Sequence, residues 1–431
     1  MDDEVIHDIG KEKTMLDVSK WDWQPGERQI AEPGAWSEKF EWVEELTASP
    51  DGEKIAAVVR TEDAESTVCV NGEAWEETFE RVWGLKFSPD GRLAGLCQTM
   101  GEWTMGVDGE TWSENYAYIW ATKFGPQGSI AAAVQQDGEY GMGVEGELWE
   151  TMYENANDFT LAPNGKSTCA VVQVKSLGQA DVEGFLAGVF SVAINGVAWD
   201  RTFVNCWTPV FDANSTKVAC QVRLTPFDYT IAVDGEPWSK TFGCVWDPLF
   251  NPADGSVLAP VRQGGKWGLA KNGDILWQPA YFQLWHTQAS MSGDIYAIGA
   301  PVYGEFTVIA NDKAWNDLFP AVIDLAVSPD GKRASAIGKK DYDYSLVVDD
   351  AIVAGPYPMI WKAVFSPDSK HYASKIELPG KKFTYFVDGK LYGRTFDQVF
   401  DPVFSPDSGK VLIRGVDGGT YVRIVVPVNE F

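Results

Sequence analysis

The sequence has no apolar segment long enough to cross a bilayer, which would need about 20 consecutive hydrophobic residues. Its first residues, Met1–Asp8, are acidic and lack the apolar stretch of a secretory signal peptide. We therefore expect a cytoplasmic protein that has no transmembrane helix of its own.

Motifs for catalysis are also missing. The chain has three histidines, His7, His286 and His371, and they are far apart in the sequence. It contains no nucleophile elbow, Walker loop, dinucleotide-binding glycine motif or His-Glu-x-x-His motif. We predict no catalytic, cofactor-binding or metal-binding residues, and we expect that the chain is not an enzyme. A lyase or glycosidase would need a cluster of Asp, Glu, Arg or His on one face, and the sequence does not indicate one.

The cysteines do not form a ligand motif. No two of the six make a Cys-x-x-Cys pair, which excludes the common iron–sulfur, structural-zinc and covalent-haem motifs. We expect buried free thiols beside the core. The six residues are Cys69, Cys97, Cys169, Cys206, Cys220 and Cys244.

Positive charge is scarce: 62 acidic residues face 35 basic ones, which gives a formal net charge of −27. An acidic surface repels nucleic acid, whose binding needs a basic surface, and it also repels anionic membranes. We therefore expect neither a nucleic-acid partner nor direct membrane insertion. Two interpretations of the acidic surface remain. It attracts a basic protein partner, or it serves solubility, which acidic residues promote.

What the sequence does have is one pattern that recurs ten times. An anchor residue, usually Trp, is followed four positions later by an aromatic residue and 14 positions later by the second residue of a turn that usually reads Ser-Pro-Asp-Gly. A repeat of about 40 residues is typical of propeller blades. The anchors are Trp36, Trp75, Trp112, Trp149, Trp199, Trp238, Trp277, Trp315, Val353 and Tyr392.

The turns indicate strands rather than helices. Ser88–Gly91 is a hairpin turn, because Pro presets φ at its second position and Gly accepts a positive φ. A second turn, Asn-Gly or Asp-Gly, follows about 20 residues later and favours a two-residue hairpin. Short β-branched runs such as Ile55–Val59 lie between the turns. Each repeat therefore predicts four strands, and the chain is predicted to be all-β, a β-propeller of ten four-stranded repeats.

The chain ends suggest how the ring closes. The tenth repeat supplies three strands, whereas Trp36–Phe40 reads as a fourth strand with no blade before it. We predict that Trp36–Phe40 completes the last blade and closes a single ring, which removes two exposed sheet edges. Two five-bladed rings are the alternative, because ten blades exceed the usual number. Residues 1–35 are then an N-terminal extension, and residues 36–431 form the propeller.

A tryptophan-rich position lies eight residues after each anchor. It begins the innermost strand, and seven of the ten residues there are aromatic. Two interpretations are open: packing between neighbouring blades, or a partner-docking rim, since Trp dominates interface hot spots. The insertion Lys175–Val189 should project from the same face. The candidate partner-binding residues are Trp83, Trp120, Trp207, Trp246, Trp285 and Trp361, together with Trp21 and Trp23 of the N-terminal segment.

Two features carry a resemblance to known proteins. The unit Phe-Ser-Pro-Asp-Gly followed by an Ala-rich strand resembles the blades of WD40-like and TolB-like propellers over residues 36–431. The 19 tryptophans, the Trp-x₁₃-Pro repeat and the openings Trp21-Asp-Trp-Gln-Pro-Gly26 and Trp36-Ser-Glu-Lys-Phe-Glu-Trp-Val-Glu-Glu45 resemble the tryptophan-rich subunits of the Tmc transmembrane electron-transfer complex of sulfate-reducing bacteria.

The second resemblance implies a cytoplasmic subunit without cofactors, peripheral at the inner membrane through its partner subunits. Those partners would be a heterodisulfide-reductase-like Fe–S subunit, a membrane b-type cytochrome and, through the complex, a multihaem cytochrome c. Together they would pass electrons from periplasmic oxidation of hydrogen or formate toward sulfate respiration. A general protein-interaction scaffold is the alternative function.

Overall fold

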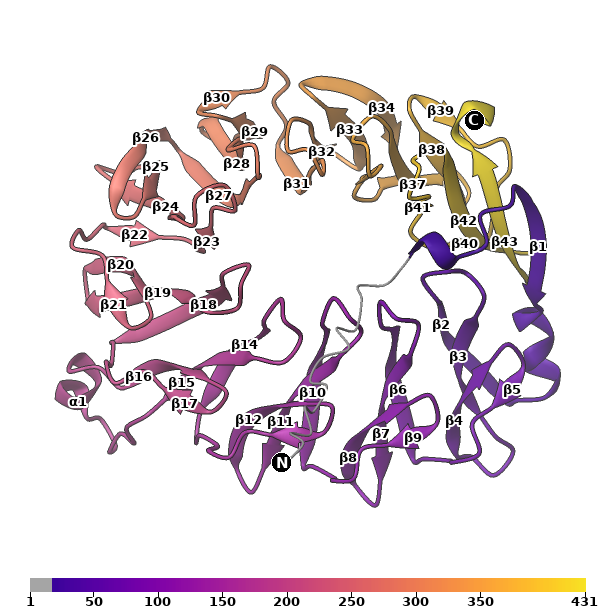
Figure 1. The fold of residues 1–431 in the computed structure, drawn as a ribbon, viewed down its shortest axis with the longest axis horizontal. Coiled ribbons are helices and arrows are strands. Elements are labelled where there is room, and N and C mark those ends of the chain that lie inside the picture. The colour runs from indigo at the N-terminus through magenta and orange to yellow at the C-terminus, as the bar shows by residue number, and fades with distance from the viewer. Residues whose placement is uncertain (1–17) are drawn as a thin grey trace, which may run out of the picture.

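The fold is a single closed ring of ten β-sheets around an open centre (Figure 1). It is taken from a computed structural model, which describes residues 18–431; the first 17 residues of the predicted extension, with His7, lie outside the described part. The predicted ten-bladed propeller is confirmed, and the alternative of two five-bladed rings is wrong. No helix within residues 18–431 is long and apolar enough to span a membrane.

The innermost strand of each sheet borders the centre of the ring. Blades are numbered one to ten from β2, and in blades six, nine and ten this strand is broken into two short pieces. The innermost strands are β2 (Trp42–Ala48), β6 (Arg81–Phe87), β10 (Tyr118–Phe124), β14 (Ala156–Leu161), β18 (Asn205–Phe211), β22 (Cys244–Val245) with β23 (Leu249–Phe250), β27 (Gln283–Ala289), β31 (Ala321–Val327), β35 (Met359–Ile360) with β36 (Val364–Phe365), and β40 (Gln398–Val399) with β41 (Val403–Phe404).

The second strand of each sheet is covered on both faces by neighbouring blades. Ile55–Val59 of blade one is buried throughout, which explains why these strands read as continuous apolar runs instead of alternating. The second strands are β3 (Ile55–Arg60), β7 (Leu93–Thr99), β11 (Ile130–Gln136), β15 (Thr168–Gln173), β19 (Val218–Thr225), β24 (Val257–Gln263), β28 (Ile295–Val302), β32 (Ala334–Lys340), β37 (Tyr372–Leu378) and β42 (Lys410–Asp417).

The third strand carries the outermost strand on its far edge. The third strands are β4 (Ser66–Val70), β8 (Glu102–Val107), β12 (Glu139–Val144), β16 (Phe190–Ile194), β20 (Asp228–Val233), β25 (Lys266–Lys271), β29 (Glu305–Ala310), β33 (Asp343–Val348), β38 (Lys382–Val387) and β43 (Thr420–Pro427). The outermost strands are β5 (Glu73–Ala74), β9 (Glu110–Thr111), β13 (Glu147–Leu148), β17 (Val197–Ala198), β21 (Glu236–Pro237), β26 (Asp274–Tyr281), β30 (Lys313–Ala314), β34 (Ala351–Tyr357), β39 (Lys390–Leu391) and β1 (Gly26–Ala31).

The turn between the third and fourth strands does more than reverse the chain. Asn71 takes φ = 51° there, and its side-chain oxygen accepts a hydrogen bond from the backbone N–H of Ile55 at 2.8 Å. An acidic or amide residue at this position binds the start of the second strand in the same way in blades one to nine. The acceptors after Asn71 are Asp108, Glu145, Asn195, Asp234, Asn272, Asn311, Asp349 and Asp388.

The Ser-Pro-Asp-Gly turns are held by their own side chains. In blade eight the Ser328 hydroxyl donates to Asp330 at 2.7 Å and accepts from the backbone N–H of Arg333 at 3.0 Å. The serine hydroxyl bond lowers the pKa of Asp330, and the same bond lowers the pKa of Asp368 and Asp407. These aspartates therefore have a structural role in the turn.

The ring closes through the N-terminal part of the chain, but not through the strand predicted. β1 pairs antiparallel with β43, from Gly26 opposite Val425 to Ala31 opposite Tyr421. Residues 26–31 thus belong to the tenth blade, although the predicted boundary placed them outside the repeats.

Trp36–Phe40 forms no strand, which corrects the prediction. Because β1 already occupies the edge of β43, the chain crosses to blade one through the 3₁₀ helix η2 (Pro33–Glu38). Trp36 and Phe40 still contribute to closure, since both are buried in one core cluster with Ile55 of blade one and Tyr421 of blade ten.

Two buried arginines of the tenth blade hold the first. Arg423 is 2% exposed, donates from Nε to the carbonyl of Asp51 at 2.8 Å and pairs with Glu53 at 3.1 Å. Arg414 donates to the carbonyl of Ser49. Burial lowers the pKa of Arg423 against the opposing pull of Glu53, and these hydrogen-bond and ion-pair partners compensate its buried charge. The short helices η1 (Val18–Lys20) and η3 (Val428–Glu430) lie at the two described ends.

Arg423→Ala should lower the free energy of unfolding by about 3 kcal/mol, because it removes charge-assisted hydrogen bonds between the last and first blades. Urea denaturation measures the change. Arg201→Ala is the control, since Arg201 is exposed and its ion pair with Glu236 spans 3.5 Å. A midpoint shift no larger than that of the control would contradict a closing role for Arg423.

Acid should weaken the Ser-Pro-Asp turns. Folding lowers the pKa of Asp330, Asp368 and Asp407, so their contribution is present above the pKa of an unfolded aspartate, about 3.9, and is lost as the pH falls through the folded pKa. The melting temperature should stay level down to about pH 5 and fall below about pH 4. Asp368→Asn should make that fall shallower, and parallel curves would refute the assignment.

Candidate protein-docking face

The residue eight positions after each anchor sits where the innermost strand becomes irregular. The register shifts directly after Trp83, Trp120 and Trp207, and the next residue has a positive φ, as at Ala121 (54°) and Thr208 (48°). In blades six, nine and ten the strand is interrupted at this position, because Trp246, Trp361 and Phe400 each follow the last residue of its first piece. A bulge of this kind re-aims a side chain out of the strand's normal alternation.

Each aromatic ring at this position packs against an aromatic residue of the third strand in its own blade. The rim rings are therefore held mainly by contacts within their own blades rather than between blades. Trp120 also contacts Phe159 of the next blade, with ring centroids 5.7 Å apart. The pairs, with ring-centroid distances, are Trp83–Trp103 (4.9 Å), Trp120–Tyr140 (6.1 Å), Trp207–Tyr229 (6.3 Å), Trp246–Trp267 (5.4 Å), Trp285–Phe306 (5.2 Å), Trp361–Phe383 (6.0 Å) and Phe400–Tyr421 (5.9 Å).

The third-strand aromatic was missed in the sequence, although a signal was present. Tyr140, Phe190 and Tyr229 each stand nine residues before an anchor, and most other blades repeat this spacing. Their backbones pair with the aromatic four after the anchor, as Tyr140 does with Tyr153. The third-strand aromatic therefore supports the rim ring, and its own backbone is held by the residue four after the anchor.

These rings are packed on one side and open on the other. Trp83 and Trp246 are each 40% exposed, and the rings of Trp120, Trp207, Trp285 and Trp361 are half-buried. A side chain supported in this way keeps one orientation while it presents a flat apolar surface to solvent.

The rim belongs to the face on which the second and third strands are joined, which we call the b–c face. Four turns of this face each carry a large apolar or aromatic side chain that is almost fully exposed: Met100, Phe227, Tyr303 and Tyr342. The insertion lies here too, as predicted, between β15 and β16, and it contains the helix α1 (Val182–Leu186) with Asp181 as its N-cap. Exposed Leu177, Val182 and Leu186 add further apolar surface.

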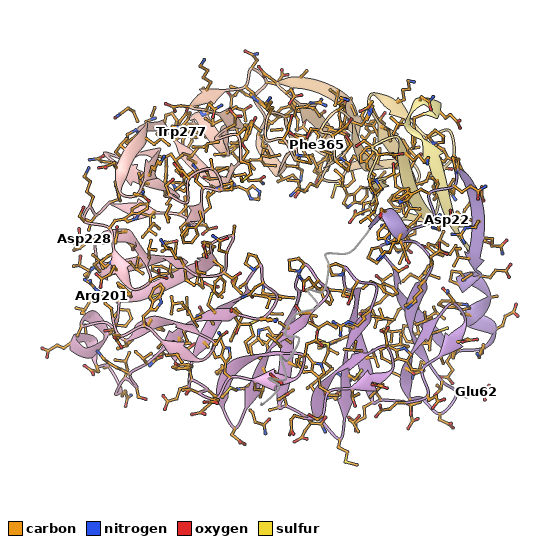
Figure 2. The ribbon with its side chains drawn as sticks, in the orientation of Figure 1. Asp22, Glu62, Arg201, Asp228, Trp277 and Phe365 are labelled. Atoms are coloured by element: carbon orange, nitrogen blue, oxygen red, sulfur yellow. The ribbon has the colours of Figure 1, made fainter. Side chains whose placement is uncertain are left out.

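Trp21 and Trp23 are not part of this face. Their rings stack at 6.1 Å, and the Trp23 indole donates to the carbonyl of Val18 at 2.8 Å. The carbonyl of Asp22 between them accepts a hydrogen bond from Arg423, which also contacts the Asp51 turn on the opposite face. The structure therefore separates these two candidates from the six tryptophans of the rim. Asp22 is labelled in Figure 2 beside the last blades.

Side chains that could bind a metal are dispersed within the described part of the chain. No cluster of three or more His, Cys, Asp or Glu that could hold a metal occurs within residues 18–431. His371 Nδ1 lies 2.5 Å from Asp388, but that carboxylate also accepts the backbone N–H of Tyr372 as the turn residue of its blade. The pair is accounted for by the repeated turn.

A cavity lies on the opposite face, between the third and fourth blades. Its volume is about 790 Å³, and its lining includes Arg92, Glu145 and Trp149. Burial raises the pKa of Glu145, but hydrogen bonds from Arg92 and the N–H of Ile130 outweigh it and lower the pKa. Glu145 is thus an ionised turn residue, which makes it a poor proton donor.

Comparisons with known proteins find no related sequence and only distant structural similarity. No family profile and no curated protein sequence matches the chain. A crystal structure of a eukaryotic initiation factor is 15% identical, covering 88% of this chain and 97% of the other, with a TM-score of 0.45. The Dos1 propeller is 10% identical over 94% and 95%, with a TM-score of 0.36.

A third similar structure is the β-propeller domain of the Trilobed protease from Pyrococcus furiosus. It is 13% identical, covering 63% of this chain and 95% of the other, with a TM-score of 0.32. At these TM-scores none of the three carries an inference about activity. The chain is a ten-bladed β-propeller by its own topology, a fold compatible with a protein-interaction scaffold.

The thiols should resist reaction in the folded protein. Five of the six cysteines are buried and Cys244 is partly buried; burial raises the pKa of Cys97 to about 12 and also raises that of Cys169 and Cys206. A thiolate-specific reagent at about pH 8 should therefore titrate at most one thiol before unfolding and six after it. Rapid reaction of several thiols in the native state would contradict the packing.

Proposed function

We propose that the chain is a non-catalytic docking protein whose b–c face binds another protein. The supporting observation is the rim, where six tryptophans lie with one side on a third-strand or neighbouring ring and the other side toward solvent. Rings held in one orientation lose little conformational entropy on binding, and Trp is enriched at interface hot spots.

The resemblance supports a more specific role. We propose a cytoplasmic subunit of a membrane-bound respiratory complex that docks or stabilises a heterodisulfide-reductase-like Fe–S subunit in sulfate respiration. The chain would then be peripheral at the inner membrane, attached through partner subunits that include a b-type cytochrome and, across the complex, a multihaem cytochrome c. The 19 tryptophans and the Trp-x₁₃-Pro repeat carry this proposal.

A general protein-interaction scaffold is the second candidate. It uses the same face and rests on the same rim, but it requires no redox partner. What separates the two is the kind of protein bound, since an Fe–S or haem partner absorbs visible light and a general scaffold's partner need not.

Purification of the tagged native protein in mild detergent should recover partner subunits with haem bands in the visible spectrum, identified by mass spectrometry. The variant Trp285→Ala should lower the yield of partners about fivefold or more, because it removes a supported rim ring. Val197→Ala, at an exposed site on the opposite face, is the control and should have no effect.

A colourless eluate with a stable protein partner would favour the general scaffold. A colourless eluate that contains only the monomer would contradict the docking proposal itself.

A further inference from the structure

Charge is distributed unevenly around the ring. Residues 18–150, which form β1 and blades one to three, contain 26 Asp and Glu against nine Lys and Arg. Residues 151–431 contain 30 against 24. Most of the net negative charge therefore lies on less than a third of the chain.

The same blades carry a continuous row of aromatic rings on the b–c face, which we call the aromatic arc: Trp83, Trp103, Tyr118 and Trp120. Successive ring centroids are 4.9, 6.4 and 6.4 Å apart. Trp83 and Tyr118 are 40% and 51% exposed, and Trp42 of blade one is 60% exposed. The arc therefore offers a larger aromatic surface than any single ring of the rim.

Carboxylates surround the arc. On the b–c turns, the blade-to-blade connections and the innermost strand β2, blades one to three carry ten exposed acidic residues but only two basic ones, Arg60 and Arg81. None of the ten forms an ion pair with Lys or Arg within the described residues. They are Glu41, Glu44, Glu45, Glu62, Asp63, Glu65, Glu80, Glu102, Asp137 and Glu139.

In blades five, eight and nine a rim or third-strand ring already has a cation of its own chain. Arg223 lies over Tyr229 at 5.5 Å, Lys339 over Tyr344 at 5.2 Å and Lys375 over Trp361 at 5.3 Å. Arg223 and Lys339 stand directly opposite their aromatic partners in the pairing of the second and third strands.

In the arc that position is neutral. Gln98 stands opposite Trp103, and Gln135 stands opposite Tyr140. Among the residues that the structure describes, no Lys or Arg lies over any ring of the arc. The arc thus has the ring faces and the surplus carboxylates of a cation–π site but lacks the cations.

We propose that the aromatic arc binds an arginine- and lysine-rich segment of a partner protein, a proposal that rests on the docking function of the b–c face. Guanidinium groups stack on Trp and Tyr and pair with carboxylates, so one basic segment satisfies both features. The complementary charge also speeds encounter and excludes acidic competitors. Phosphate-bearing partners are repelled by the same carboxylates.

Blade six provides a matched control for the arc. Trp246 is as exposed as Trp83, and it stacks on Trp267 as Trp83 stacks on Trp103. Its third-strand partner, however, stands opposite Arg262, and Lys266 begins that strand. Trp83→Ala and Trp246→Ala therefore remove the same kind of contact from the fold in different electrostatic surroundings.

The test measures binding of a fluorescein-labelled peptide of alternating Arg and Gly to the full chain by fluorescence anisotropy in about 0.15 M salt. Trp83→Ala should weaken binding about fivefold or more, whereas Trp246→Ala should change it less than about twofold. Equal effects, or none, would overturn the arc and leave bulk charge attraction as the cause of binding.

A second variant does not depend on removing a ring. Gln98→Arg installs over Trp103 the cation that blades five and eight possess, and it should weaken peptide binding about as much as Trp83→Ala. Gln173→Arg makes the same charge change opposite Phe190 in blade four and should have a smaller effect. An equal effect of the two Gln→Arg variants would contradict specific occupation of the arc.

Two further outcomes separate this proposal from the docking function. Binding of a neutral oligosaccharide such as cellopentaose in place of the peptide would assign the arc to sugar stacking and overturn the basic partner. If native partners co-purify undiminished with Trp83→Ala and Gln98→Arg, docking stands and the arc is not its site. If no partner co-purifies although the peptide binds the arc, the docking function fails instead.

Discussion

Closure of the ring is the constraint on which the other features depend. Every blade has two apolar faces, and each face is buried only by a neighbour, so an open row of ten would leave two faces and two edges exposed. β1 pairs with β43, and Trp36 packs between the first and last blades. The contact joins residues almost 400 positions apart, so forming it costs loop-closure entropy.

Polar groups add directed hydrogen bonds to the apolar contact between the first and last blades. The first blade presents the carbonyls of Ser49 and Asp51 toward the last, and Arg414 and Arg423 occupy them. Both guanidinium groups donate to carbonyls across this contact, although the buried Nε of Arg414 has no acceptor among the described residues, and these directed bonds help to specify which blades meet. The same logic recurs around the ring on a smaller scale, where Ser369 and Ser408 each bind the turn of the preceding blade.

Much of this architecture could be predicted from the sequence because propeller turns are local. Pro89 and Gly91 identify one hairpin, and Asn71-Gly72 identifies another, through backbone angles that few other residues accept. The repeat period and the position of the rim tryptophans followed from the order of those turns.

Other parts had no such local signal. The closing strand Gly26–Ala31 is mostly exposed and polar, and it pairs through its backbone, so nothing in its side chains marks it as a strand. The bulges put Ala121 and Thr208 at positive φ, although neither residue type favours it, because the blade fixes that conformation. The cations above the rim rings depend on pairing between strands, which the repeat alone did not reveal.

The functional account joins these observations. In seven blades an aromatic residue of the third strand supports one ring at the rim, and the other three blades lack that ring, at Glu44, Asn157 and Ile323. In blades five, eight and nine a cation of the same chain lies over a rim or third-strand ring. In blades two and three, rings without a cation of the same chain occur together with a high density of carboxylates. A repeat that is nearly uniform in its fold is therefore distinctly non-uniform in what it presents on the b–c face.

The most direct test of this account is hydroxyl-radical footprinting of the native protein, alone and in the assembly with which it purifies. The account predicts protection of Trp42, Trp83 and Tyr118 on the b–c face, while exposed Met291 in a turn of the opposite face stays as reactive as in the free chain. Protection of Met291 with no change at the tryptophans would place the partner on the other face and contradict the account.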